Sequence, residues 1–283
     1  MDNPAMPSTI NPAALWTAYG HHAELILGSG PRPIVHRGKG WFAALSGAPH
    51  VDLNQAAVFG PAESGDLDEL VKVVRAGDVP TLLAVSSSVT SHRGLVSDRL
   101  SRSGFVSAAE VEYLFLAPDI PARFDGEFVV RRVDDDNGLG GIAQIVAESH
   151  GYATTLISEM WGSRLVARPD VGCWVAWDGD EPASMAVVTR VGDLLGVFDM
   201  MTSPRHRRRG AGRMTLTHAL AAAAASAPQP IAATFFWSTP MGRPLYEAVG
   251  FGAVDTIEVW TLGASDQDMA AVGAGSMPDK SKE

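Results

Sequence analysis

The stretch Arg205-His-Arg-Arg-Arg-Gly-Ala-Gly-Arg213 decides how this chain of 283 residues folds, because it separates two segments of different character. The segment before it, residues 194–201, is short and apolar, which predicts a buried strand, and residues 214–225 after it are rich in alanine, which predicts a helix. Glycines let a backbone approach a ligand closely, and the first N–H groups of a helix have no internal partner. A strand, this loop and a helix N-terminus together predict a site for a phosphate group.

Two familiar phosphate-loop patterns do not fit the stretch, since no lysine follows its glycines and a third glycine is missing. The spacing Arg207-Arg-Arg-Gly210-Ala-Gly212 instead resembles the acetyl-CoA pyrophosphate loop of the GNAT acyltransferase superfamily, Arg/Gln-x-x-Gly-x-Gly/Ala. The residues downstream extend the resemblance. They give a strand at 231–237, a helix that ends in Leu245-Tyr-Glu-Ala-Val-Gly-Phe251, and a last strand at 256–262. The resemblance covers roughly residues 128–262.

The first half of the chain is similar to the second, which indicates an internal repeat; the alternative is chance similarity of two αβ segments. A constant shift carries Gly104-Phe105 onto Gly250-Phe251 and Val111-Glu112 onto Ile257-Glu258. The first half therefore resembles another GNAT fold, which begins with an amphipathic segment at 12–27. Its connecting loop, Phe59-Gly-Pro-Ala-Glu-Ser-Gly-Asp66, is acidic, and the shift places Leu100 where the second half has Tyr246. Because an acidic loop repels a pyrophosphate, we expect this copy to be degenerate.

These patterns predict an α/β protein with mixed sheets (α+β), built as two tandem GNAT-like domains. The expected organisation is a disordered N-terminus at 1–10, a degenerate domain at 11–117, a linker at 118–127, a catalytic domain at 128–262 and a disordered tail at 263–283. The linker is rich in proline and charge, and the two ends have no apolar period.

Composition restricts the classes of function. The net charge is −10 at pH 7, so the arginine cluster is local and nucleic acid is not an expected partner. No apolar run is long enough to span a membrane and no signal-peptide pattern opens the chain, which predicts a cytoplasmic protein. We expect a monomer or a homodimer. Cys173 lies in an apolar segment and is expected to be a buried structural thiol. No metal site is predicted.

The resemblance implies roles in binding acetyl-CoA. By position, Met200, Met201 and Thr202 would pair with the pantetheine arm as if it were an added strand. The pyrophosphate would meet the loop residues Arg207, Arg208, Arg209, Gly210, Ala211, Gly212 and Arg213. Thr239 stands where many relatives carry an asparagine that contacts the cofactor, so this sequence departs from the family pattern at that position.

The resemblance also implies catalytic residues. Tyr246 matches the tyrosine that protonates the CoA thiolate in many relatives; the alternative is a core tyrosine with its hydroxyl at the surface. Asp199, in an otherwise apolar strand, is the candidate general base, directly or through a water, or else a hydrogen-bonded structural residue. The region that lines the acceptor pocket in the family carries Glu148, Tyr152 and Trp161 here.

We therefore expect an N-acetyltransferase that moves an acetyl or short acyl group from acetyl-CoA to the amine of a small molecule. One alternative is a protein or peptide N-acetyltransferase, which would need an open acidic groove. The other is a regulatory protein that binds CoA without doing chemistry. An intact loop together with Tyr246 disfavours this last class.

Overall fold

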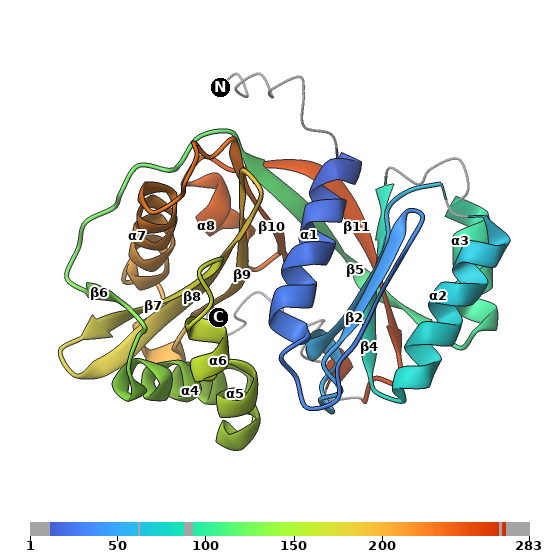
Figure 1. Ribbon diagram of the computed structural model, residues 1–283, viewed down its shortest axis with the longest axis horizontal. Helices are drawn as coiled ribbons and strands as arrows, with labels where there is room; N and C mark the ends of the chain where they lie inside the picture. Colours follow the sequence, from blue (N-terminus) through green and yellow to red (C-terminus); the bar gives the residue numbers. More distant parts are fainter. Residues whose placement is uncertain (1–11, 62, 88–92, 266–267, 270–283) are drawn as a thin grey trace, which may run out of the picture. The chain divides into compact units, whose positions relative to one another are not determined.

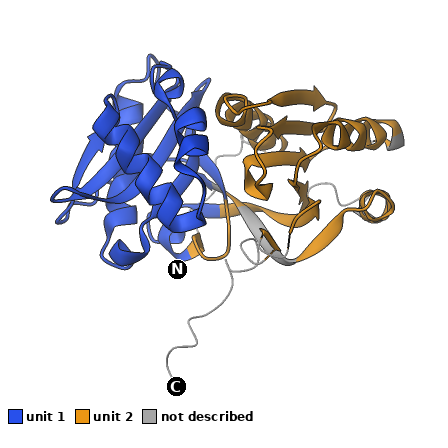
Figure 2. Ribbon diagram, turned by 90° about the horizontal axis from the view of Figure 1, so that it is seen from below, with its two compact units in different colours: residues 1–8, 115–237, 244–252 blue, residues 9–114, 238–243, 253–283 orange. Residues whose placement is uncertain are grey.

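The computed structural model describes residues 12–61, 63–87, 93–265 and 268–269. They divide into two compact units (Figures 1 and 2). Unit 1 contains Phe115–Trp237 and Pro244–Gly252, and unit 2 contains Thr9–Leu114, Ser238–Arg243 and Ala253–Glu283. The predicted α/β class with mixed sheets is confirmed. The segment 1–10 and most of 263–283, for which the sequence predicts disorder, lie outside the described residues.

Unit 1 is built on five neighbouring strands, in the order β10 (Ala233–Ser238), β9 (Leu194–Thr202), β8 (Glu181–Val191), β7 (Val171–Asp178) and β6 (Val129–Arg132). Strands β6 to β9 are antiparallel, and β10 joins β9 in parallel. Seven of the eight residues of β7 are buried, because helices cover both faces of the sheet. A strand that is covered on both sides reads as a continuous apolar run, as 171–177 does.

The two long helices of unit 1 lie on opposite faces of this sheet (Figure 1). Helix α4 (Asp136–His150) begins at Asp135, whose carboxylate accepts a hydrogen bond from the N–H of Gly138 at 2.8 Å, and it ends at Gly151 with a φ of 72°. Helix α7 (Ala211–Ala225) covers the other face. Three short helices complete the unit: α5 (Thr154–Met160), α6 (Ser163–Val166) and α8 (Arg243–Glu247).

Unit 2 is built on six neighbouring strands, in the order β1 (Ile34–Gly38), β2 (Trp41–Leu45), β3 (Asn54–Val58), β4 (Thr81–Ser86), β11 (Gly252–Leu262) and β5 (Val106–Ala117), with parallel and antiparallel pairs. Alternate residues of β2 serve opposite faces. Trp41 packs into the core with Leu70 of α2 (Ser64–Gly77), whereas the ring of Phe42 lies against Tyr19 of α1 (Pro12–Leu27). Helix α3 (Arg93–Arg102) follows β4, and its Val96 and Leu100 pack in the same core as Trp41.

Strand β11 comes from the end of the second half of the sequence and yet belongs to unit 2. It pairs with β4 from Ile257↔Ser86 to Leu262↔Thr81. The buried carboxylate of Asp255 accepts hydrogen bonds from the indole of Trp16 at 2.7 Å, from the backbone N–H of Ser87 at 3.0 Å, and from the hydroxyls of Ser86 and Ser87. The expected domain 128–262 thus supplies its last strand to the fold of the first half, which local sequence patterns do not encode.

Candidate functional site

The end of β9 differs from the rest of the sheet of unit 1. Its pairing with β10 runs only from Leu194↔Ala233 to Gly196↔Phe235, whereas its pairing with β8 continues to Thr202. The register with β8 shifts between Ala186↔Met200 and Val187↔Phe198, so Asp199 forms a bulge, and its φ of 46° lies in the left-handed region. A bulge of this kind bends the strand and increases its twist. Among the described pairs, β10 offers no partner to Met200, Met201 and Thr202, so an extended ligand can add there as a strand.

An uncapped helix N-terminus follows β9. The arginine loop, residues 205–213, leads into α7, whose N-cap is Gly210 with a φ of 87° and no side chain to accept a hydrogen bond. The first N–H groups of α7 therefore lack a side-chain acceptor. A Cβ atom at Gly212 would come within 2.9 Å of Thr202 Oγ1 and 3.3 Å of Met200 Cε. Glycine at this position lets the helix begin directly against the end of β9.

Most of the arginines in the loop hold the loop in place. Four of them have protein partners: Arg205 with Glu148, Arg207 with the carbonyl of Thr202, Arg209 with Asp178, and Arg213 with the ring of Phe124. Arg209 also lies over the ring of Phe128, 5.2 Å from its centre. Arg208, with a φ of 61°, is exposed and has no partner in the part of the chain that the structure describes. Its guanidinium is therefore available to an anion at the N-terminus of α7.

Glu148, which the sequence suggests as an acceptor-binding residue, connects α4 to the loop after β9. Its carboxylate accepts hydrogen bonds from the hydroxyl of Ser203 at 2.7 Å, from Arg205 at 2.7 Å and from the side chain of Gln144 at 3.0 Å. The Ser203 hydroxyl, Gln144 and Arg205 lower the pKa of this carboxyl below its ordinary value of 4.5. Their contribution to stability is therefore complete above pH 4.5 and is lost as the pH falls through the lowered pKa.

Asp199, at the bulge, forms a hydrogen bond with Trp161. The indole Nε1 of the buried Trp161 donates to Asp199 Oδ2 at 3.0 Å. Cys173 lies nearby on β7, and burial first, then the negative charge of Asp199, raise the pKa of its thiol to about 12. A thiol with such a pKa stays protonated and is a poor nucleophile, in agreement with a structural cysteine. The candidate general base, Asp199, and the candidate acceptor-pocket residue, Trp161, are thus in contact.

Tyr246 lies in α8 and is buried, with its ring packed against Phe236 at 3.8 Å and Phe251 at 6.3 Å between ring centres. Burial raises the pKa of its hydroxyl above the ordinary value, so the phenol is fully protonated at neutral pH. The neighbouring Leu245 lies close to the start of α7, with its Cδ2 3.6 Å from the position of a Cβ at Gly212. Helix α8 therefore adjoins the N-terminus of α7.

The two remaining candidates, Tyr152 and Thr239, make none of the contacts described above. Tyr152 is buried and stacks on His150, with ring centres 5.1 Å apart. Thr239 lies between β10 and α8, in a segment that counts with unit 2, and its carbonyl accepts a hydrogen bond from the N–H of Gly242 at 3.1 Å.

The corresponding place in unit 2 is built differently. Strand β3 pairs with β4 as far as Val58↔Val85 and shows no register shift against β2. The N-terminus of α2 is closed by a capping box, in which Glu63 accepts from the backbone of the first turn and Asp66 accepts from the N–H of Glu63 at 3.0 Å. Trp16 and Phe59 stack next to this loop. Carboxylates thus take the position that an anionic ligand would need.

Within the described residues, no three or more His, Cys, Asp or Glu side chains form a group fit to hold a metal ion. None of the helices described has the length and apolar character needed to cross a membrane.

Comparison with known proteins agrees with this arrangement. A family model described as an acetyltransferase (GNAT) domain matches residues 169–252, from β7 through α8. Similar solved structures include a GCN5-related N-acetyltransferase from Kribbella flavida, with 14% identity, a TM-score of 0.62, and coverage of 91% of this chain and 98% of that chain. A tandem GNAT protein from the clavulanic acid biosynthesis pathway is 14% identical with a TM-score of 0.55, and the match covers 91% of this chain and 98% of that chain. No curated protein matches this chain.

These likenesses confirm the GNAT resemblance and agree with two GNAT-like domains. The contacts of Ser203 and Arg205 with Glu148 were not predictable from the sequence, because residues 148 and 203 are 55 positions apart. The same is true of Asp178, which holds Arg209 from the far end of β7. A motif shows which residues form a loop but not which distant side chains fix its conformation.

Replacing Glu148 by glutamine removes the charge that orders Ser203 and Arg205 at neutral pH. We expect the Glu148→Gln variant to bind acetyl-CoA several-fold more weakly in calorimetric titration, because the loop before α7 loses its anchor on α4. Glu159→Gln, at an exposed position on α5, is the matched control. Unchanged acetyl-CoA affinity, together with a raised KM for the amine, would instead assign Glu148 to acceptor binding.

Proposed function

We propose that this protein transfers an acetyl or short acyl group from acetyl-CoA to the amine of a small molecule, with the site in unit 1. The observation that carries the proposal is the open end of β9 beside the uncapped N-terminus of α7. An extended arm with peptide-like groups can pair with Met200, Met201 and Thr202, and a pyrophosphate fits the N–H groups of Gly210, Ala211, Gly212 and Arg213. Both halves of one ligand are thereby accommodated.

The residues around the loop fit an anionic group. Gly212 leaves no side chain between the helix N-terminus and β9, and Gly210 supplies no capping oxygen that would compete with a ligand. Arg208 offers an unengaged guanidinium, while Arg207, Arg209 and Arg213 keep the loop in place through their own partners. Charge-assisted hydrogen bonds from Arg208 and the backbone would hold the phosphates without moving the loop.

The chemistry divides between two residues of this chain. A bound thioester supplies the activated acyl group, and an amine nitrogen that has lost its proton displaces the thiolate. Asp199, placed at the bulge and oriented by Trp161, is the residue that we assign to taking the amine proton, directly or through a water. Tyr246, protonated at neutral pH, is assigned to returning a proton to the sulfur. Tyr152 and Trp161 complete the proposed contacts with the acceptor.

A small amine is favoured over a protein as the acceptor. The protein has a net charge of −10, which attracts a cationic amine. Trp161 and Tyr152 are buried, and we assign them to apolar walls of the acceptor pocket rather than to an exposed groove. A protein or peptide acceptor remains the second candidate, which a panel of amines and peptides in the same thiol-release assay would distinguish.

We further propose that unit 2 is the degenerate copy. Its β3 remains paired with β4, its helix N-terminus is capped by Glu63 and Asp66, and Leu100 is a buried core residue at the position that matches Tyr246. Each of these features removes one part of the arrangement found in unit 1. The first half of the chain then serves to pair with β11, the strand that follows the signature helix α8, through β4.

Replacing Arg208 by alanine tests the cofactor site, because the side chain of this arginine has no partner among the residues that the structure describes. We expect the Arg208→Ala variant to bind acetyl-CoA about tenfold more weakly, as for one charge-assisted hydrogen bond, with unchanged thermal stability. Calorimetric titration of acetyl-CoA measures the effect. Arg131→Ala, an exposed arginine on β6, should bind like the wild type. Failure of the wild type to bind acetyl-CoA would refute the proposed function.

Replacing Tyr246 by phenylalanine tests the proton donor. We expect kcat for thiol release to fall by about 100-fold with the best amine of the panel, while the Kd for acetyl-CoA stays the same. Tyr19→Phe is the control, since it also removes the hydroxyl of a buried tyrosine but in unit 2. An unchanged kcat would make Tyr246 a packing residue of the Phe236 and Phe251 cluster.

A further inference from the structure

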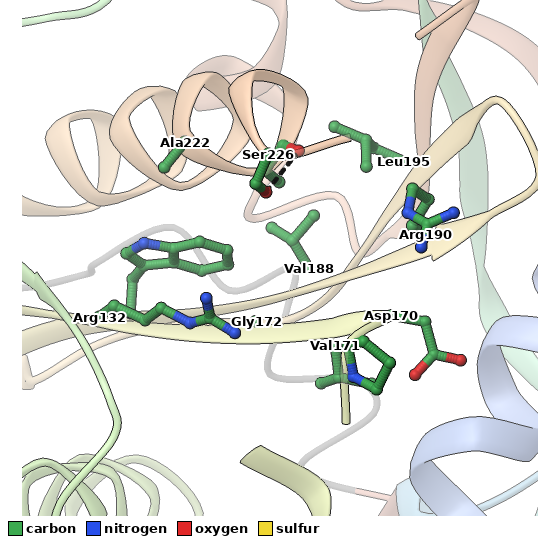
Figure 3. Close-up of a pocket in the computed structure, with 12 residues that line it drawn as sticks. Arg132, Asp170, Val171, Gly172, Val188, Arg190, Leu195, Ala222 and Ser226 are labelled. Atoms are coloured by element: carbon green, nitrogen blue, oxygen red, sulfur yellow. Dashed lines mark hydrogen bonds between the residues drawn. The ribbon is translucent and has the colours of Figure 1, made fainter. Parts of the chain in front are cut away.

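Unit 1 contains a cavity of about 380 Å³ at the C-terminal end of α7 (Figure 3). It lies between the last turns of α7, at Ala222 and Ser226, and the strands β7, β8 and β9. The helix rises about 1.5 Å per residue, so Ala222 lies some 16 Å from the N-terminus of α7. The volume is in the range of cavities that hold small organic ligands. Nothing in the proposed transfer reaction uses this cavity.

The floor of the cavity is apolar. Val188, Leu195 and Ala222 line it, together with the ring of Trp174. Gly172 lies beneath that ring, since a Cβ at this position would come within 2.1 Å of Trp174 Cη2. The glycine therefore lets the indole lie close to the strand, where it lines the cavity with apolar atoms.

Two arginines stand at the sides of this apolar floor. Arg132 comes from β6 and Arg190 from the end of β8, and Figure 3 shows them on opposite sides of the cavity. Neither guanidinium has a hydrogen-bond or ion-pair partner within the described residues. An arginine offers a planar fork of donors that suits a carboxylate. Both are thus available to an anionic group that enters the cavity.

The other charges around the cavity do not cancel these arginines. Asp170 lines it too, but Arg168 pairs with both oxygens of that carboxylate, at 3.0 and 2.9 Å. The C-terminus of α7 carries about half a negative charge, and Ser226 already donates to the carbonyls of Ala222 and Ala223. The balance at the cavity is therefore positive.

We propose that this cavity is a second binding site, and that it takes a small organic carboxylate with an apolar body. The apolar part lies on Trp174, Val188 and Leu195, and the carboxylate binds Arg132 or Arg190. The site is separate from the proposed acetyl-CoA site, so it can be occupied whether or not the transfer reaction takes place. A ligand here would contact α7, the helix that begins at the arginine loop.

Titration of 4-phenylbutyrate into the full chain, followed by ligand-observed NMR and calorimetry, tests the proposal. We expect a Kd below about 1 mM and at least tenfold weaker binding of 4-phenylbutanol, which has the same apolar body without the charge. The variants Arg132→Gln and Arg190→Gln should each weaken binding of the carboxylate, by about tenfold for the arginine that carries the main contact. Arg131→Gln, one position away on the opposite face of β6, is the matched control and should have no effect.

Three outcomes would overturn the proposal. They are no binding of 4-phenylbutyrate at millimolar concentration, equal affinity for the alcohol, and binding that neither Arg132→Gln nor Arg190→Gln weakens more than the control. Because the probe is not a thioester and the readout is not activity, the result does not depend on the acetyl-CoA experiments.

Discussion

The functional interpretation of unit 1 depends on the point where β9 stops pairing with β10. Beyond Gly196 the described pairs with β10 end, and the bulge at Asp199 bends the strand while its pairing with β8 continues. Backbone groups are strong hydrogen-bonding groups that need partners. Among the described pairs, Met200, Met201 and Thr202 have partners in β8 and none in β10, so an extended ligand is proposed to pair with them. The N-terminus of α7 lies beside them and is proposed to bind an anion. A molecule that carries both features in sequence satisfies both at once.

The two units have a similar topology and differ at the loop where acetyl-CoA is proposed to bind in unit 1. In each, a strand leads through a loop into a helix that packs on the sheet. In unit 1 the helix begins at Gly210 without a cap, whereas in unit 2 Glu63 and Asp66 cap the helix with their own carboxylates. A helix N-terminus that is satisfied internally has no need of a ligand. The difference lies in a few side chains at the loop rather than in the order of the strands.

Much of the fold follows from the sequence, because the strand at 194–201, the helix at 214–225 and the helix at 12–27 carry clear local patterns, and the arginine loop was recognisable from its spacing. Helix α7 begins at Ala211, within the loop, because its first turn is set by Gly210 and Gly212. The placement of β11 in unit 2 was not predictable, since it rests on the contacts of Asp255 with Trp16, Ser86 and Ser87, up to 239 positions away. The partners of the loop arginines, and the bond from Trp161 to Asp199, were hidden for the same reason.

The central claim is that acetyl-CoA binds along β9 and the arginine loop of unit 1, and not at the matching loop of unit 2. Hydrogen–deuterium exchange of the full chain, with and without acetyl-CoA, tests it most directly, because it reports on the backbone N–H groups that are proposed to bind the ligand. We predict slower exchange in residues 198–213 and no change in residues 59–66. Protection of 59–66, or the absence of protection in 198–213 at saturating acetyl-CoA, would contradict the account.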